Sequence, residues 1–225
     1  MSSGNVFERL FKQRATIDKL LLDGKRDPEE ISCIFQAIIA GKKLAEVTPT
    51  LQDMLARWQT FYRKRFKQNF DFSRLVVPPH QEGFDRLLVV AQGMTPQLLY
   101  GKCAELFPSW KWTDKNLDEI VQSVRTAKDG HYAVWVRDRR EADEELKGRS
   151  ANWLQEQKIL GVTLEERKLH ELIYFDETGD HLDIENWTLC SGSRYSDGSV
   201  PYASWSDGKF KVDWYGSGYA YGGLR

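Results

Sequence analysis

The sequence predicts an α/β protein, with an α+β fold as the alternative, in which a small helical N-terminal region precedes a mixed-sheet body with a C-terminal antiparallel hairpin. Three observations predict this class. Apolar residues recur at helical spacing through residues 1–75. From residue 84 to residue 175, apolar runs alternate with helical patterns, as in proteins whose helices cover a sheet. After residue 187, short apolar runs alternate with turn residues, which is typical of antiparallel strands.

The N-terminal region, residues 1–75, divides into three helical segments. The first ends near Gly24, and the second starts at Asp27-Pro28, where an N-cap residue precedes a proline suited to the first turn. The third opens at Thr48. Because each segment carries an apolar stripe, we expect the three helices to pack on one another as a small helical array.

The body is predicted to cover residues 84–225, after a linker at residues 76–83 in which two prolines exclude a helix. An Asp-Gly pair between two apolar runs near the C-terminus is a strong hairpin signal. The last ten residues are rich in Gly and Tyr, and we expect a flexible tail. The predicted elements of the body are strands at 86–91 and 131–136, helices at 95–107, 116–127, 141–157 and 163–175, and a hairpin of 200–205 with 209–215.

Composition excludes several classes of protein. The 225 residues carry a net charge of −1, which gives no overall bias toward nucleic acid or a membrane. The first 80 residues hold 14 Lys and Arg against 9 Asp and Glu, and the remainder hold 18 against 24, a pattern explained by a basic appendage or by chance. The three cysteines lie far apart, so neither a disulfide framework nor a zinc site is predicted. With no signal peptide and no apolar span, we predict a soluble cytoplasmic protein with no membrane partner, no metal and no cofactor.

Six stretches of the body carry a distinctive wording, at residues 130–139, 141–146, 150–152, 175–179, 181–183 and 186–194. In these stretches the chain resembles one family of uncharacterised bacterial proteins, over roughly residues 83–215. The N-terminal third and the Gly/Tyr tail lie outside the resemblance. The resemblance implies a bacterial and intracellular origin, and it transfers no activity, cofactor or catalytic residue.

A loop of small residues is the strongest candidate for a catalytic or anion-binding site. Exposed backbone N–H groups of Ser191, Gly192 and Ser193 can hold an anion, Arg194 can add a positive charge, and Cys190 can act as a nucleophile. The spacing argues against a phosphatase loop, because the arginine follows the cysteine by four residues rather than six. We therefore favour a buried cysteine at the end of a strand, followed by a turn.

The segment 57–67 mixes basic and aromatic residues. On a helix, Arg63, Lys64 and Lys67 share an exposed face that can contact the phosphates of a nucleic acid. An ordinary amphipathic helix with solvated cations accounts for the same pattern, and we favour that interpretation.

Aromatic residues are frequent in the C-terminal strands. Exposed rings there can stack on a base or a sugar, whereas buried rings pack across strands. Trp214 alternates with Phe210 and Val212, which predicts packing. Trp205 lies beside the hairpin turn, so we keep it as a candidate for ligand binding.

Acidic residues and one histidine gather at residues 176–185. Such groups can bind a divalent cation or transfer protons. The turn Glu-Thr-Gly-Asp within this segment favours solvated acids instead, so no metal site is predicted. Nearby, Glu166 and His170 are four residues apart, and we expect them to be partners on one face of a helix.

Taken together, these features favour a non-enzymatic binding or regulatory module that contacts nucleic acid or a protein partner, because no complete catalytic constellation can be assembled. The alternative is a hydrolase or transferase that uses the anion-binding loop from Cys190 to Arg194. The accessibility of Cys190 separates the two, because a catalytic thiol must reach its substrate.

Overall fold

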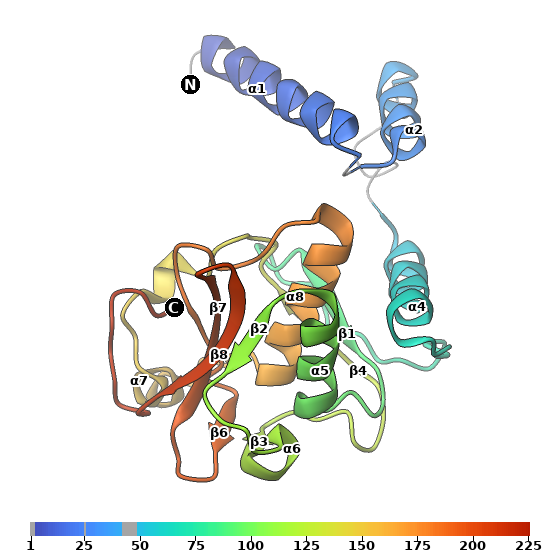
Figure 1. Ribbon diagram of the computed structural model, residues 1–225. Coiled ribbons are helices and arrows are strands. Elements are labelled where there is room, and N and C mark those ends of the chain that lie inside the picture. Colours follow the sequence, from blue (N-terminus) through green and yellow to red (C-terminus); the bar gives the residue numbers. More distant parts are fainter. Residues whose placement is uncertain (1–2, 25, 42–48) are drawn as a thin grey trace.

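The structure is a computed structural model that describes residues 3–24, 26–41 and 49–225. The described residues form seven α-helices and eight β-strands in mixed sheets, which confirms the predicted α/β class. Figure 1 shows that helices α1 and α2 lie apart from a body that holds all of these strands. None of the described helices combines the length and the apolar character that a membrane span requires.

Helices α1 (Ser3–Leu22) and α2 (Pro28–Ile39) form the N-terminal part of the described chain. Asp27 caps α2 as predicted, because its side chain accepts a hydrogen bond from the backbone N–H of Glu29 at 2.9 Å. Gly24 and Gly41 follow the two helices with positive φ angles of 65° and 73°. The end of α1 and the start of α2 therefore lie close to where the sequence placed them.

Helix α4 (Leu51–Phe66) packs on the body, so the expected array of three helices is wrong for this element. Its aromatic side chains pack against strand β1 (Arg86–Val90) of the body. Trp58 donates its Nε1–H to the carbonyl of Leu87 at 2.9 Å, and the hydroxyl of Tyr62 donates to the carbonyl of Val89 at 2.7 Å. Helix α4 and strand β1 share one hydrophobic core across the segment 76–83, which was predicted as a linker between domains.

The strands form three small sheets. Strands β1 (Arg86–Val90) and β4 (Tyr132–Val136) pair antiparallel, with Leu88 opposite Val134. Strands β3 (Val121–Ser123) and β6 (Ser193–Tyr195) also pair antiparallel. The largest sheet has the order β2-β8-β7-β5, in which β2 runs parallel to β8 and the other pairs are antiparallel. Its members are β2 (Ser109–Lys111), β5 (Thr188–Leu189), β7 (Val200–Ser206) and β8 (Lys209–Tyr215).

The predicted hairpin is present as β7 and β8. Asp207 and Gly208 connect the two strands with φ angles of 51° and 69°. Positive φ angles at both turn positions fit the right-handed twist of the paired strands, and Asp-Gly adopts them at little cost.

Helix α8 (Leu164–Thr178) lies inside the body, with helix α5 (Pro96–Leu106) beside it (Figure 1). A capping box starts α8 where the helix was predicted to begin, since Thr163 and Glu166 each accept a hydrogen bond from the backbone N–H of the other. Nine of its residues are buried, and five of these are charged. This burial of a charged helix positions the candidate site described below.

Two predicted helices are shorter than expected. The segment 116–127 contains only helix α6 (Leu117–Ile120) before the chain extends into β3. The segment 141–157 contains a 3₁₀ turn (Glu144–Leu146) and helix α7 (Ala151–Glu156), separated by Gly148 with a φ angle of 66°. Strand pairing with β6 ends the first pattern, and the glycine interrupts the second.

The C-terminus differs from the flexible tail that was expected. Leu224 is fully buried and forms a parallel bridge with Trp187. Arg225 is also buried, and its guanidinium pairs with Glu144. Leu224 thus belongs to a second, smaller hydrophobic core, together with Ala151, Leu189 and Val200.

Candidate ligand-binding cleft

A cleft of about 510 Å³ opens between the β1–β4 ribbon and the segment 137–162. Apolar side chains make up much of its lining, and we call the residues that α8 contributes, among them Glu166 and Arg167, the floor of the cleft. Leu88 and Val134 contribute one wall, and Leu154, Leu160 and Leu182 lie on the other side. Its volume falls within the range of small-molecule pockets, about 300 to 1,000 Å³.

Arg125 and Glu166 form the first polar pair on the floor. The guanidinium donates two parallel hydrogen bonds to the carboxylate, at 2.7 and 2.8 Å, and a third to the carbonyl of Gly161 at 2.7 Å. Glu166 is fully buried, and its bond to Arg125 raises the pKa of the guanidinium against the opposing effect of burial. The two parallel hydrogen bonds therefore fix the orientation of both side chains.

Arg167 holds the second group of charges. Its guanidinium donates to Glu171 at 2.9 Å and to Asp183 at 3.0 Å, and all three side chains are buried. Burial raises the pKa of Asp183, with Arg167 acting in the opposite direction. The imidazole of His181 lies 2.8 Å from the Glu171 carboxylate. Two carboxylates thus share one buried cation at the base of the cleft.

His170 lies one turn along α8 from Glu166 and Arg167 and also lines the cleft. Its buried Nε2 atom has no hydrogen-bond partner in the part of the chain that the structure describes. Burial, followed by the nearby cations Arg86 and Arg167, holds the pKa of His170 well below its usual value. The neutral imidazole carries one donor and one acceptor nitrogen, which suits a polar ligand group rather than an ion.

The predicted anion-binding loop is engaged inside the protein. The backbone N–H groups of Ser191, Gly192 and Ser193 donate to the carbonyls of Leu189, Val162 and Cys190, at 2.8, 3.0 and 2.9 Å. The Arg194 guanidinium donates to the carbonyls of Ser191 and Ser193, each at 2.8 Å. Because these donors face carbonyl oxygens, the loop forms no anion cradle, and that interpretation is corrected.

Cys190 is fully buried, and burial raises the pKa of its thiol to about 12. A buried neutral thiol is a poor nucleophile, which removes the basis for an enzyme centred on it. The loop instead supports the start of α8, because the Ser193 hydroxyl accepts a hydrogen bond from the backbone N–H of Leu164 at 2.9 Å. A side chain on Gly192 would lie 2.8 Å from the Gly161 carbonyl oxygen, so this contact requires glycine.

The basic face of α4 lies beside the acidic end of α8. Lys64 pairs with Asp176 at 2.8 Å, Lys67 donates to the carbonyl of Lys64 at 3.0 Å, and Arg63 lies 3.5 Å from the Thr60 hydroxyl. Each of the three candidate nucleic-acid contacts therefore has a partner within the chain. Whether they also contact nucleic acid stays a prediction.

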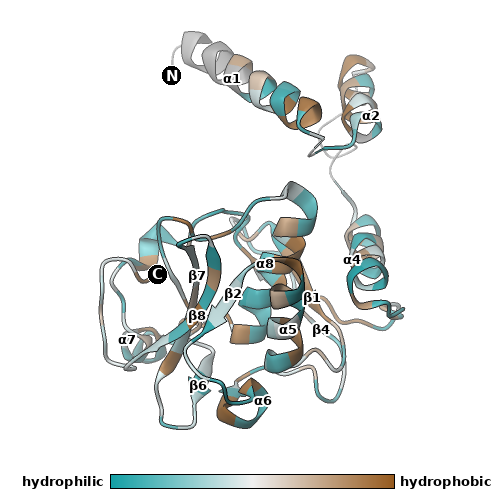
Figure 2. Ribbon diagram, viewed as in Figure 1, coloured by the Kyte–Doolittle hydropathy of each residue, from teal (hydrophilic) through white to brown (hydrophobic). Residues whose placement is uncertain are grey.

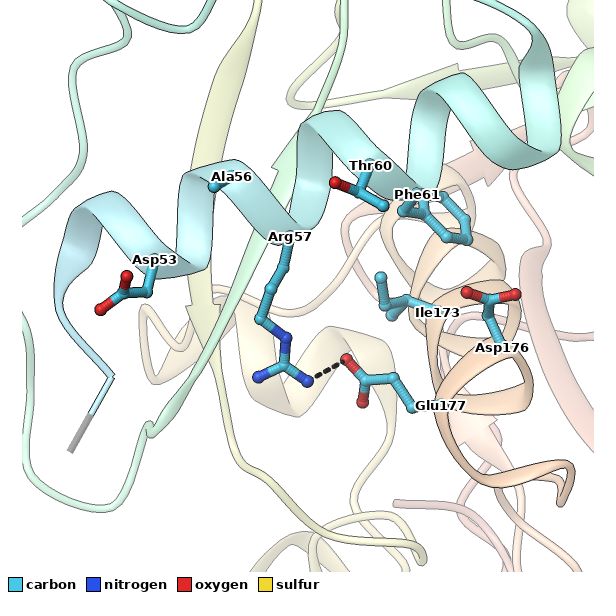
Figure 3. Close-up of a pocket in the computed structure, with 8 residues that line it drawn as sticks. All are labelled: Asp53, Ala56, Arg57, Thr60, Phe61, Ile173, Asp176 and Glu177. Atoms are coloured by element: carbon cyan, nitrogen blue, oxygen red, sulfur yellow. Dashed lines mark hydrogen bonds and ion pairs between the residues drawn. The ribbon is translucent and has the colours of Figure 1, made fainter. Parts of the chain in front are cut away.

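A second hollow, of about 450 Å³, lies between α4 and α8 (Figure 3). Arg57 reaches across it to Glu177 at 2.9 Å, and Phe61 lies close to Ile173 at its base. The cations of α4 meet the carboxylates of the last turns of α8, and this pairing fixes one helix against the other. This hollow is shallow and already bridged, so the first cleft is the stronger candidate site.

Trp205 packs within the protein. Its ring stacks on that of His181, with centroids 3.3 Å apart and planes inclined by 5°, and it meets Phe107 edge to face. Trp214, expected to pack in the core with Phe210 and Val212, is 44% exposed at the end of its strand. Trp214 still packs on a ring, because it meets Trp112 edge to face with centroids 6.1 Å apart, and Trp205 is the less exposed of the two tryptophans.

The residues on the cleft floor carried weak signals in the sequence. Glu166 and His170 were expected to be partners, yet Glu166 pairs with Arg125, which is 41 residues away. His181 and Asp183 were assigned to a solvated turn, but they belong to the buried network of Arg167. No group of three or more potential metal ligands occurs among the described residues.

Comparison of the chain with protein-family models, with curated proteins and with solved structures gave no match. The resemblance to uncharacterised bacterial proteins therefore stays a prediction. We therefore infer the function from the geometry of the cleft.

Proposed function

We propose that the chain is a non-enzymatic binding module that takes a small, partly apolar molecule into the cleft between the β1–β4 ribbon and the segment 137–162. The observation that carries the proposal is a cleft of about 510 Å³ whose lining combines apolar side chains with charged side chains that are paired within the protein, and in which the His170 Nε2 atom has no partner among the described residues. Such a combination is typical of sites that bury most of a small ligand and orient it with few hydrogen bonds.

The rim of the cleft supports this proposal. Leu160 is 84% exposed and Ile159 is 37% exposed, although both residues line the cleft. Exposed apolar side chains at the mouth of a pocket gain stability when a ligand covers them. The ligand surface facing the walls is therefore expected to be apolar.

The floor supports a polar group at the inner end of the ligand. Arg125 and Arg167 are neutralised by buried carboxylates, and His170 is neutral. A charged ligand group would lose its hydration in the cleft and would meet no unpaired opposite charge there. An uncharged hydrogen-bonding group loses less free energy of hydration when it enters. We expect recognition by shape and hydrogen bonding rather than by net charge.

The proposal is tested with the uncharged fluorescent apolar probe N-phenyl-1-naphthylamine and the variant Val134→Phe. Val134 lines the cleft, and the larger ring fills part of it. The matched control is Val124→Phe, because Val124 is 72% exposed and lies outside the cleft. We expect the native chain and the control to bind the probe equally and Val134→Phe to bind at least tenfold more weakly. Equal binding by all three proteins contradicts the proposal.

A further inference from the structure

Helix α2 presents an apolar face that no described part of the chain covers. Ile34, Phe35, Ile38 and Ile39 are 36%, 41%, 56% and 84% exposed. None of the residues described in α1 and α2 belongs to either hydrophobic core of the body. Figure 2 shows the hydrophobic stretches of α2 standing away from the body.

The spacing of these residues is that of a helix–helix interface. Ile31, Phe35 and Ile38 recur at intervals of four and three residues, and Ile34 and Ile39 widen the stripe on either side. Monomeric proteins in water rarely expose a continuous patch of this kind. Phe11 and Leu22 on α1 are also exposed, at 70% and 88%, so the apolar surface extends over both helices.

The charges of α1 and α2 are complementary. Helix α1 carries four Lys and Arg residues and two Asp and Glu residues, whereas α2 carries two Glu residues and no cation and is capped by Asp27. An interface between two identical chains places the same surface on both sides, so that surface must contain its own complement. The α1–α2 unit meets this condition, because it has a basic helix, an acidic helix and an apolar stripe.

We propose that the occupant of this face is a second copy of the chain. The α1–α2 units of two chains pack about a two-fold axis, with α1 of one copy against α2 of the other. Four amphipathic helices then share one apolar centre, the arrangement of an antiparallel four-helix bundle. This inference is independent of the ligand proposed for the cleft, because the cleft lies entirely within the body.

One cysteine allows the dimer to be observed directly. Cys33 on α2 is exposed, whereas Cys103 and Cys190 are fully buried, so it is the only accessible thiol among the described residues. On a helical projection Cys33 lies opposite Ile31, so a label on its sulfur stays clear of the apolar stripe. A nitroxide attached there reports the distance between two copies without altering the proposed interface.

The test combines light scattering with spin-label distance measurement on the full chain. We expect a mass of twice 26.1 kDa at micromolar concentration and a defined Cys33–Cys33 distance between copies. Ile38→Asp places a charge in the stripe and is expected to weaken the dimer at least a hundredfold and to abolish the distance signal. Gln36→Asp, on the opposite side of α2, is the matched control and should remain dimeric.

The proposal is overturned if the native chain is monomeric at every concentration of a 100-fold dilution series that starts at about 0.1 mM. Dimers of micromolar affinity assemble in this range. Equal weakening of the dimer by both variants also overturns the proposal. A circular-dichroism spectrum and probe binding at the cleft show that each variant keeps its body folded. A monomer that still binds the probe therefore rejects the dimer alone and leaves the proposed function standing.

Discussion

Helices α2 and α8 reverse the usual relation between composition and burial. Helix α2 is mostly apolar, yet Ile38 and Ile39 are more than half exposed. Helix α8 begins Leu-Glu-Glu-Arg-Lys, and its four charged residues there are at most 4% exposed. A helix is therefore buried when its surroundings supply partners for its side chains, whatever its hydropathy. In α8 every buried charge has such a partner, and in α2 the apolar face has none within the described chain.

The largest expected effect comes from removing a charge from α8. Arg167→Met leaves Glu171 and Asp183 buried without their cation, and we expect a loss of about 3–5 kcal/mol in the free energy of unfolding. Urea denaturation measures it. The matched control is Arg139→Met, whose ion pair with Glu145 is exposed and whose loss should leave stability nearly unchanged. Equal stability of both variants contradicts the account of α8.

The dependence of the free energy of unfolding on pH tests the burial of Lys168 on α8. Burial lowers the pKa of Lys168 from 10.5 to about 8. Between these two values the unfolded chain binds a proton that the folded chain does not, so this residue makes stability rise with pH. Relative to Lys168→Met, the native chain should gain up to about 1.4 kcal/mol per pH unit in this window. A stability difference that is constant with pH shows that Lys168 is not held in a desolvated site.

Helix α4 is an intermediate case, because its apolar stripe packs against strand β1 of the body. The Tyr62 hydroxyl donates to the Val89 carbonyl and accepts from the Ala91 N–H at 3.0 Å. Tyr62→Phe leaves both groups buried without a partner, and we expect a loss of about 1–3 kcal/mol in urea denaturation. Tyr219→Phe, on a residue that is 48% exposed, should change stability much less.

The smallest effect is expected on α2. Ile39→Ser changes an apolar residue that is 84% exposed, and the free energy of unfolding of the body should change by about 0.5 kcal/mol or less. Tryptophan fluorescence follows the body selectively, because no tryptophan lies in α1 or α2. A loss above about 2 kcal/mol, typical of a buried isoleucine, means that α2 packs on the body instead.

Local signals predicted much of the fold. The Asp207-Gly208 turn, the capping box of Thr163 and Glu166, and the apolar runs of β1 and β4 each depend on neighbouring residues. Burial depends on residues far apart in the chain, so it was harder to predict. The pairing of Arg125 with Glu166 spans 41 residues, and no local pattern indicated that Glu166 is buried on the floor of a cleft.

The environment of the loop from Cys190 to Arg194 also depends on residues outside the loop, so it was hard to predict from the local sequence. Its small residues fit an anion cradle, and only the positions of Val162 and Leu189 show that its N–H groups are already bonded. In contrast, the burial of Cys190 matches the structural interpretation that its sequence context favoured.

The most direct test of the proposed function is a titration of the isotope-labelled native chain with the uncharged probe N-phenyl-1-naphthylamine, followed by two-dimensional NMR. We predict that the largest shifts of backbone amide signals fall on residues around the cleft, with Val134, Leu160 and His170 among them. Shifts confined to α2, or no saturable shifts at all, contradict a binding site in the cleft.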